Sequence, residues 1–166
     1  MFTIRKATQA DFLPAALILE GAKVKMFTEG IVQWDSGYTT PAYMQKDLDN
    51  GYLYVAEKDG EIAAHITIIE AQEPQYLDEK NWKDSEGKPC CIRRMAVKDV
   101  LQGQGIGTET VRLACEKIRK EGYTSVRFDA FQKNPTLQKM VDKADFTRIG
   151  VVLFSKGPYD LCELVF

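Results

Sequence analysis

The feature that most constrains this chain is the segment Gln-Gly-Gln-Gly-Ile-Gly-Thr at residues 102–108. It follows an apolar run from Cys90 to Val97 and opens an amphipathic helical pattern that reaches about Lys120. A glycine-rich turn between a strand and a helix exposes backbone N–H groups at the positive end of the helix dipole, and such groups bind anions. The helix start lacks the Lys-Ser/Thr pair of a nucleoside-triphosphate P-loop. The sequence therefore predicts a different phosphate-bearing ligand.

Composition narrows the class of protein. The chain has 166 residues, of which 45% are hydrophobic and 28% charged, and a formal net charge of −2. This length suffices for a sizeable core, and we expect a single domain over residues 1–166. The small net charge favours neither nucleic acid nor an anionic membrane as a partner. Because no apolar run could span a bilayer and no signal-peptide pattern opens the chain, we expect a cytoplasmic protein.

The cysteines predict neither a metal site nor a disulfide framework. They are Cys90, Cys91, Cys115 and Cys162, and no C-x-x-C pair occurs among them. Adjacent cysteines on a strand point to opposite faces, so Cys90 and Cys91 are not expected to bind the same metal ion. We expect reduced cysteines in the core and no bound metal.

Hydrophobic periodicity predicts alternating strands and helices. The expected strands cover residues 2–6, 52–57, 61–69, 90–97, 125–131, 148–155 and 161–166, and the expected helices cover 10–27, 41–50, 105–120 and 134–143. Asp59-Gly60 between two alternating runs is a strong hairpin signal. The polar stretch 71–89 predicts a long irregular loop, which is usually functional or mobile. The order predicts an α/β domain with a mixed sheet and helices on its faces.

The glycine loop and the strand before it resemble a known family. Arg94-Met-Ala-Val97 followed by Gln102-Gly-Gln-Gly-Ile-Gly107 is similar to the core motif of the GNAT superfamily of acyl-CoA N-acyltransferases, written Arg/Gln-x-x-Gly-x-Gly/Ala. The strand at 125–131, Asn134 and Phe146 also lie where that family has its fifth strand, an asparagine and a terminal aromatic. The resemblance implies the GNAT-like fold, a mostly antiparallel sheet of about seven strands splayed between strands 4 and 5.

The resemblance implies acetyl-CoA as the acyl donor. In the family, loop amides wrap the pyrophosphate of coenzyme A, and the splayed strand pairs with the pantetheine arm. Carried over to this sequence, the residues that bind acetyl-CoA are Met95, Ala96, Val97, Gln102, Gly103, Gln104, Gly105, Ile106, Gly107, Thr108 and Asn134. A strand N–H near Met95 would polarise the thioester carbonyl as an oxyanion hole does. The implied activity is N-acetyl transfer to a primary amine by direct attack in a ternary complex.

One departure from the family pattern concerns the general acid. The family commonly has a tyrosine five residues before the terminal aromatic, and here that position is Val141. The family's glycine before the aromatic is Asp145. Tyr123 and Tyr159 are possible substitutes for the missing hydroxyl. The departure keeps a second function open, a non-catalytic module that binds acyl-CoA.

The general base has three candidates, since the attacking amine must lose a proton. Arg93 stands where relatives often carry an acidic residue or a histidine. The candidates are His65, Glu70 and Asp129. A lone strand histidine is more often structural, and Asp129 equally fits a solvated carboxylate at a strand end.

Aromatic residues in two loops are candidates for binding the acceptor amine. In the family, the loop between the first two helices overhangs the acceptor, and Trp34 and Tyr38 lie there. Tyr76 and Trp82 lie in the long loop before the fourth strand. These side chains predict either the wall of a pocket for a small-molecule or peptide amine, or packing under the loops. The family often dimerises, which leaves a homodimer open.

A dinucleotide-binding enzyme is a third possibility. Gly103-x-Gly105 is present, and Asp129 follows about twenty residues later, as that fingerprint requires. However, Thr108 replaces the third glycine, and the loop comes after an antiparallel hairpin instead of in a first βαβ unit.

Overall fold

A computed structural model describes all residues from Met1 to Phe166. The chain divides into two compact units, each made of two segments: Met1–Ile68 with Arg93–Leu113, and Ile69–Ile92 with Ala114–Phe166. Strand β4 (Pro89–Val97) and helix α4 (Ile106–Lys120) each pass from one unit into the other. Neither unit is therefore continuous in the sequence.

The first unit contains an antiparallel ladder of β1 (Phe2–Lys6), β2 (Leu53–Lys58) and β3 (Glu61–Ile69). Asp59 and Gly60 join β2 to β3, and both have positive φ, 54° and 88°. Two central residues with positive φ define the turn whose twist matches a β-hairpin. The predicted Asp-Gly hairpin is confirmed.

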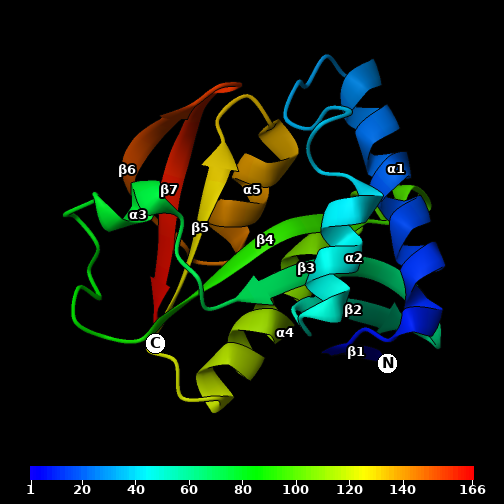
Figure 1. Cartoon of the computed structure of the whole chain (residues 1–166), viewed down its shortest axis with the longest axis horizontal. Coiled ribbons are helices and arrows are strands. Elements are labelled where there is room, and N and C mark those ends of the chain that lie inside the picture. The colour runs from blue at the N-terminus through cyan, green and yellow to red at the C-terminus, as the bar shows by residue number, and fades with distance from the viewer. The chain divides into compact units, whose positions relative to one another are not determined.

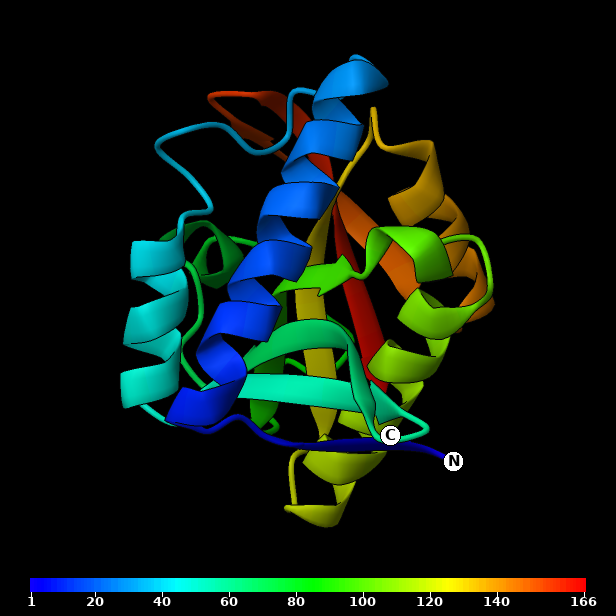
Figure 2. The same cartoon turned by 90° about the vertical axis from the view of Figure 1, so that its right-hand side faces the viewer.

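Helices cover both faces of this ladder. Helices α1 (Phe12–Thr28) and α2 (Pro41–Asp49) lie side by side (Figure 2). Pro41 opens α2 and the Thr40 hydroxyl accepts a hydrogen bond from the Tyr43 amide at 3.4 Å, which explains why the helix begins here. One core cluster joins these helices to β2 and consists of Ala15, Ala16, Leu19, Met44 and Leu53. A second joins the start of α4 to the other face and consists of Ala56, Ala63, Ala64 and Ile106.

The second unit contains the remaining strands. Strand β4 pairs in parallel with β5 (Ser125–Phe131), β5 pairs antiparallel with β7 (Gly157–Val165), and β7 pairs antiparallel with β6 (Thr147–Phe154). The strand order is β1-β2-β3-β4-β5-β7-β6. This mixed seven-stranded sheet confirms the predicted fold class.

The last strand begins earlier than the sequence predicts. We expected it to begin at Leu161, but it begins at Gly157, which pairs with Phe154 across a tight turn. Gly157 and Pro158 have low strand propensity, so the periodicity does not reveal them as strand residues. Pairing with β6 overrides that propensity.

Strand β5 presents its two sets of alternating side chains to different helices. Phe128 meets Phe146, which follows α5 (Pro135–Lys143), with ring centroids 4.8 Å apart and planes at 86°. Figure 1 shows α5 beside β5. Asp129 points the other way, toward α3 (Pro74–Leu77). The stretch 71–89, expected to be irregular throughout, thus contains a short helix started by Pro74.

Candidate active site

The glycine loop forms a turn between β4 and α4, as the sequence predicts. Gly103 and Gly105 have φ of 78° and 82°, and a Cβ built on either would meet no atom within 4 Å. The Gln102 side-chain amide donates to the Val97 carbonyl oxygen at 3.1 Å, which ties the loop to the end of β4. The first hydrogen bond of α4 runs from Glu109 to Gly105. The amides of residues 106–108 therefore have no acceptor within the helix.

The third glycine of the motif has a different role. A Cβ on Gly107 would lie 3.5 Å from Met95 Cε and 3.5 Å from Val97 Cγ2, which is ordinary contact. The absence of a side chain at Gly107 lets the first turn of α4 approach β4 closely. The glycine loop thus combines two open positions with one packing position.

Strand β4 leaves its ladder with β5 early. The paired register contains three pairs and ends at Cys91 with Arg127, whereas β4 continues to Val97. Arg94 has φ of 45°, in the left-handed region that non-glycine residues rarely adopt. The end of the ladder at Cys91 agrees with the predicted splay, because main-chain groups further along β4 do not belong to it.

A polar cluster that the sequence analysis did not identify fixes Arg94. Its Nε and Nη2 each donate to the Asp47 carboxylate at 2.7 Å. The Thr67 hydroxyl donates to the same carboxylate at 2.7 Å, and Arg94 Nη1 donates to the Tyr38 hydroxyl at 3.4 Å. Burial acts to lower the pKa of Arg94, but the hydrogen bonds and charge of Asp47 outweigh it and raise that pKa. The sequence signal for this cluster was Asp47, an acidic residue that lies between the apolar Met44 and Leu48 on the inner face of α2.

His65, one candidate base, is buried on β3 with 1% of its surface exposed. Neither ring nitrogen has a hydrogen-bond partner. Burial, helped by the positive charge of Arg94, lowers the pKa of His65 to about 4. At neutral pH the ring is therefore uncharged and weakly basic.

The two carboxylate candidates each receive a hydrogen bond from a tyrosine. The Tyr76 hydroxyl donates to Asp129 Oδ2 at 2.5 Å, and the Tyr123 hydroxyl donates to Glu70 Oε1. Tyr76 is buried with 1% exposed, whereas Glu70 lies on the surface. The two pairs share a chemistry but differ in their access to water.

Residues 24–146 match the profile of the Acetyltransferase (GNAT) family. The chain belongs to this family. It is similar in structure to an acetyltransferase of the GNAT family from Streptococcus agalactiae, with 22% identity, a TM-score of 0.87, and coverage of 99% of this chain and 95% of that one. No curated protein sequence matches the chain.

The chain is also similar in structure to two acetyltransferases of named activity. Aminoglycoside acetyltransferase AAC(6')-Ib, solved with coenzyme A, is 22% identical with a TM-score of 0.70, over 99% of this chain and 95% of that chain. The ribosomal-protein-S18-alanine N-acetyltransferase from Escherichia coli is 14% identical with a TM-score of 0.65, over 98% and 91%. At these identities the likeness establishes the shared fold.

The position of the family's usual general acid carries no hydroxyl in this GNAT protein. Val141 is fully buried in α5. Tyr159 packs between the rings of Phe131 and Phe154, with centroids 4.9 Å and 5.1 Å away. The hydrogen bond from Tyr123 to Glu70 raises the pKa of Tyr123, with burial contributing, so its proton is held more tightly.

Two positions of the family pattern in the second unit, Asn134 and Asp145, shape the local backbone. Asn134 caps α5, the helix that the sequence predicts from this residue, since its side chain accepts a hydrogen bond from the Leu137 amide at 3.1 Å. Asp145, which replaces the family's glycine, has φ of 61° and so adopts the conformation that glycine favours. At position 145 the backbone thus has the conformation typical of glycine, although the residue is an aspartate.

The four aromatic candidates divide into two pairs. Tyr38 is 40% exposed and stacks edge-on against Tyr43 with centroids 5.3 Å apart, while Trp34 packs against the cluster under α1. Tyr76 and Trp82 are 1% and 7% exposed and pack with Cys91 and Leu161. Their burial favours packing for the second pair.

None of the helices combines the length and apolar character needed to cross a bilayer.

Proposed function

We propose that this GNAT protein is an N-acetyltransferase that uses acetyl-CoA to acetylate a primary amine in a ternary complex. The amine nitrogen attacks the thioester carbonyl carbon, so a C–N bond forms and the C–S bond breaks. The nitrogen loses a proton, and coenzyme A leaves as the thiolate or thiol. The observation that carries the proposal is the Gly103–Gly105 loop, which presents first-turn amides of α4 beside a strand that has left its ladder.

Acetyl-CoA fits the residues of the loop. The space around Gly103 and Gly105 is open, so backbone amides are accessible to a diphosphate that side chains would otherwise block. AAC(6')-Ib, which has a similar structure, has been solved with coenzyme A and with acetyl-CoA. By this proposal Gln102–Thr108 bind the pyrophosphate, Met95–Val97 hold the pantetheine arm, and Asn134 contributes from the start of α5.

Asp129 is the best supported base of the three candidates. It is half-buried on β5, two residues beyond the end of the β4–β5 ladder, and its carboxylate is oriented by Tyr76. His65 is less suitable because it is 1% exposed, so an acceptor amine cannot reach its ring nitrogens. Glu70 stays the alternative. The reaction can proceed without the family's tyrosine at the position of Val141. The leaving group is then a thiolate, which departs readily because a thiol has a pKa of only about 8.5.

The acceptor is a small-molecule or peptide amine. AAC(6')-Ib has been solved with kanamycin and with ribostamycin, and another similar structure is that of a ribosomal-protein-S18-alanine N-acetyltransferase. Trp34 and Tyr38, in the loop between α1 and α2, are the acceptor-binding residues we propose, because Tyr38 offers an exposed ring and a hydroxyl. A homodimer is compatible with this function and is tested by light scattering.

Calorimetry and an assay of coenzyme A release test this proposal together. Acetyl-CoA should bind and raise the melting temperature, whereas NAD and ATP should not. The acceptors to be tested are kanamycin, ribostamycin, spermidine and a peptide with N-terminal alanine. With at least one of them the protein should release coenzyme A from acetyl-CoA. Binding without release would favour the non-catalytic module that Val141 leaves open. Stabilisation by NAD alone would contradict the proposal.

A further inference from the structure

The segment between β3 and β4 carries a set of contacts that the proposed function does not use. Tyr76 on α3 is 1% exposed, and its hydroxyl donates to Asp129 Oδ2 at 2.5 Å. Asp129 lies on β5, 53 residues away in the sequence. A buried phenol on a strand carboxylate restricts that carboxylate to one orientation and favours its charged form.

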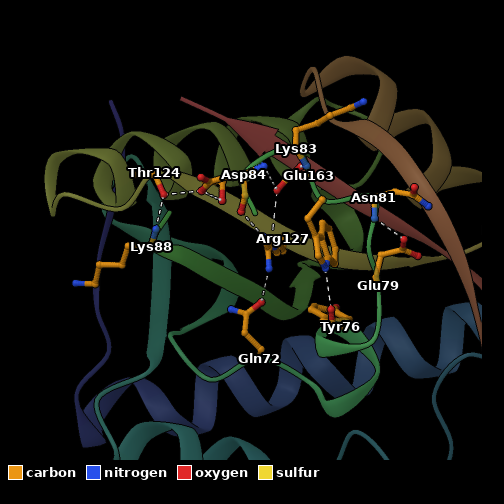
Figure 3. Close-up of polar contacts among 12 residues, drawn as sticks. Gln72, Tyr76, Glu79, Asn81, Lys83, Asp84, Lys88, Thr124, Arg127 and Glu163 are labelled. Atoms are coloured by element: carbon orange, nitrogen blue, oxygen red, sulfur yellow. Dashed lines mark hydrogen bonds and ion pairs between the residues drawn. The ribbon is translucent and has the colours of Figure 1, made fainter. Parts of the chain in front are cut away.

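Trp82 holds Tyr76 in place. Its indole Nε1 donates to the Tyr76 carbonyl oxygen at 2.7 Å, and the two rings lie 5.7 Å apart at 55° (Figure 3). Both side chains pack with Cys91 and Leu161. Four residues are too few to form a stable helix on their own. The side chain of Trp82 therefore helps to stabilise the short helix α3.

A buried ion pair in turn holds Trp82. Arg127 on β5 and Glu163 on β7 are register partners, with Nε and Oε1 3.4 Å apart. The Arg127 guanidinium lies 4.2 Å from the centre of the Trp82 ring. The Glu163 carboxylate accepts the amide of Lys83 at 2.7 Å, and Arg127 Nη2 donates to the Asp84 carbonyl oxygen at 2.7 Å. The ion pair thus hydrogen-bonds to the main chain of Lys83 and Asp84, the two residues that follow Trp82 (Figure 3).

The side chain of Asp84 provides a second anchor. Its Oδ2 accepts hydrogen bonds from the hydroxyls of Thr124 at 2.5 Å and Ser125 at 2.6 Å. Burial acts to raise the pKa of Asp84, but these bonds outweigh it and lower that pKa. A charged Asp84 therefore ties the segment to the start of β5, the same strand that carries Asp129.

We propose that Tyr76 is a positioning residue for the general base Asp129, and that Trp82, clamped by Arg127 and Glu163, sets the position of Tyr76. This inference rests on the proposed function, because it assigns the base of that reaction. Tyr76 acts through Asp129: its hydroxyl orients the carboxylate that takes the proton of the amine.

The surroundings of Asp129 allow this effect to be isolated. The Tyr76 hydroxyl from α3 donates to Asp129, and Arg127 lies two residues away on the same face of β5, while the Cys162 thiol of β7 pairs with Phe128 on the opposite face and senses the Asp129 charge from there. Burial raises the pKa of Cys162 to about 12, so this thiol stays neutral at working pH. Arg127 is already paired with Glu163. Tyr76→Phe removes the hydrogen bond of Tyr76 to Asp129 and leaves the ion pair of Arg127 with Glu163 in place.

The chain supplies a matched control in the pair Tyr123 and Glu70. It is also a tyrosine hydroxyl on a carboxylate, it lies in the same unit, and Glu70 is the rival base. Tyr76→Phe and Tyr123→Phe therefore remove the same group from the same kind of bond, which is part-buried at Asp129 and exposed at Glu70. If Glu70 were the base, the two variants would exchange their effects.

The first measurement follows the carboxyl ¹³C signals of the full-length protein through a pH titration, with Asp129→Asn used for assignment. Tyr76→Phe should raise the titration midpoint of Asp129 by about 1–2 pH units, because it loses a hydrogen bond to a charged group. Tyr123→Phe should leave that midpoint unchanged. An unchanged midpoint in Tyr76→Phe would overturn the inference.

The second measurement is the pH profile of coenzyme A release with the best acceptor of the panel. Tyr76→Phe should move the acid limb upward by the same 1–2 pH units, with the KM for acetyl-CoA unchanged, and Asp129→Asn should lower kcat at least a hundredfold. Trp82→Phe, which keeps a ring and loses Nε1, should move the limb in the same direction by a smaller amount. A limb that moves in Tyr123→Phe and not in Tyr76→Phe would assign the base to Glu70.

Failure of the proposed function has a separate signature. It would appear in the unmodified protein, which would release no coenzyme A with any amine of the panel, and this outcome overturns the assignment of Asp129 as the base. Failure of the inference alone would appear only in the variants, as full activity with an unshifted acid limb in Tyr76→Phe.

Discussion

Arg94 and Asp47 meet side-on, with Nε and Nη2 of the guanidinium each 2.7 Å from a different carboxylate oxygen. The side chains are only 10% and 8% exposed. Arg94 also has the left-handed backbone, so the ion pair fixes the residue at which β4 becomes irregular. A buried bidentate pair of this kind specifies geometry as well as contributing energy.

Asp47→Asn should lower the free energy of unfolding by about 3–5 kcal/mol, because it leaves the Arg94 charge buried and unpaired. Urea denaturation measures the change. Glu61→Gln is the control: Glu61 and Lys98 are 3.3 Å apart and largely exposed, so its removal should cost less than about 1 kcal/mol. Equal effects of the two substitutions would contradict the role given to the buried pair.

His65 should make the fold sensitive to acid. Its pKa is about 4 in the folded state and 6.5 in the unfolded state, so between these values the unfolded chain binds more protons. The free energy of unfolding should therefore fall by roughly 3 kcal/mol as pH decreases from 6.5 to 4. His65→Leu should remove that part of the slope in urea titrations at several pH values. An unchanged slope in His65→Leu would show that other groups cause the loss.

Two glycines should respond in opposite directions to alanine. A Cβ on Gly87 would overlap Asp84 Oδ1 and Thr124 Oγ1, so Gly87→Ala should destabilise by about 1–3 kcal/mol. A Cβ on Gly21, within α1, would meet nothing within 4 Å, so Gly21→Ala should stabilise by about 0.5–1 kcal/mol. Thermal unfolding measures both changes, and a stabilised Gly87→Ala would contradict the packing described around Asp84.

Asp145→Gly should stabilise the protein by up to about 1 kcal/mol. Asp145 has φ of 61°, a conformation that costs energy for a residue with a Cβ and none for glycine. The substitution also restores the residue type usual in the family. Destabilisation in a denaturation experiment would mean that the Asp145 side chain makes a stabilising interaction that outweighs the backbone strain.

Local patterns in the sequence predicted much of the fold. Strand β5 has the predicted limits, α2 begins at the predicted Pro41, and the Asp59-Gly60 hairpin and the glycine-rich turn before α4 occur where expected. Each of these depends on neighbouring residues, through alternation, capping or turn chemistry.

Contacts between distant segments could not be predicted. The bond from Tyr76 to Asp129 joins residues 53 positions apart, and the one from Arg94 to Asp47 joins residues 47 apart. Neither spacing leaves a periodic signal. The sequence therefore identified Asp129 as a candidate base but not the tyrosine that orients it, and it could not decide that Trp82 is buried.

Acetyl-CoA binding measured by calorimetry is the most direct test of this account. The unmodified protein should bind with a dissociation constant between about 1 µM and 1 mM, the usual range of KM values. Gly105→Glu should abolish binding, because a carboxylate would meet the pyrophosphate, whereas Gly60→Glu should bind normally. Gly60 is the matched control, since its φ of 88° imposes similar strain in a different turn. Unchanged affinity in Gly105→Glu, or no binding by the unmodified protein, would contradict the account.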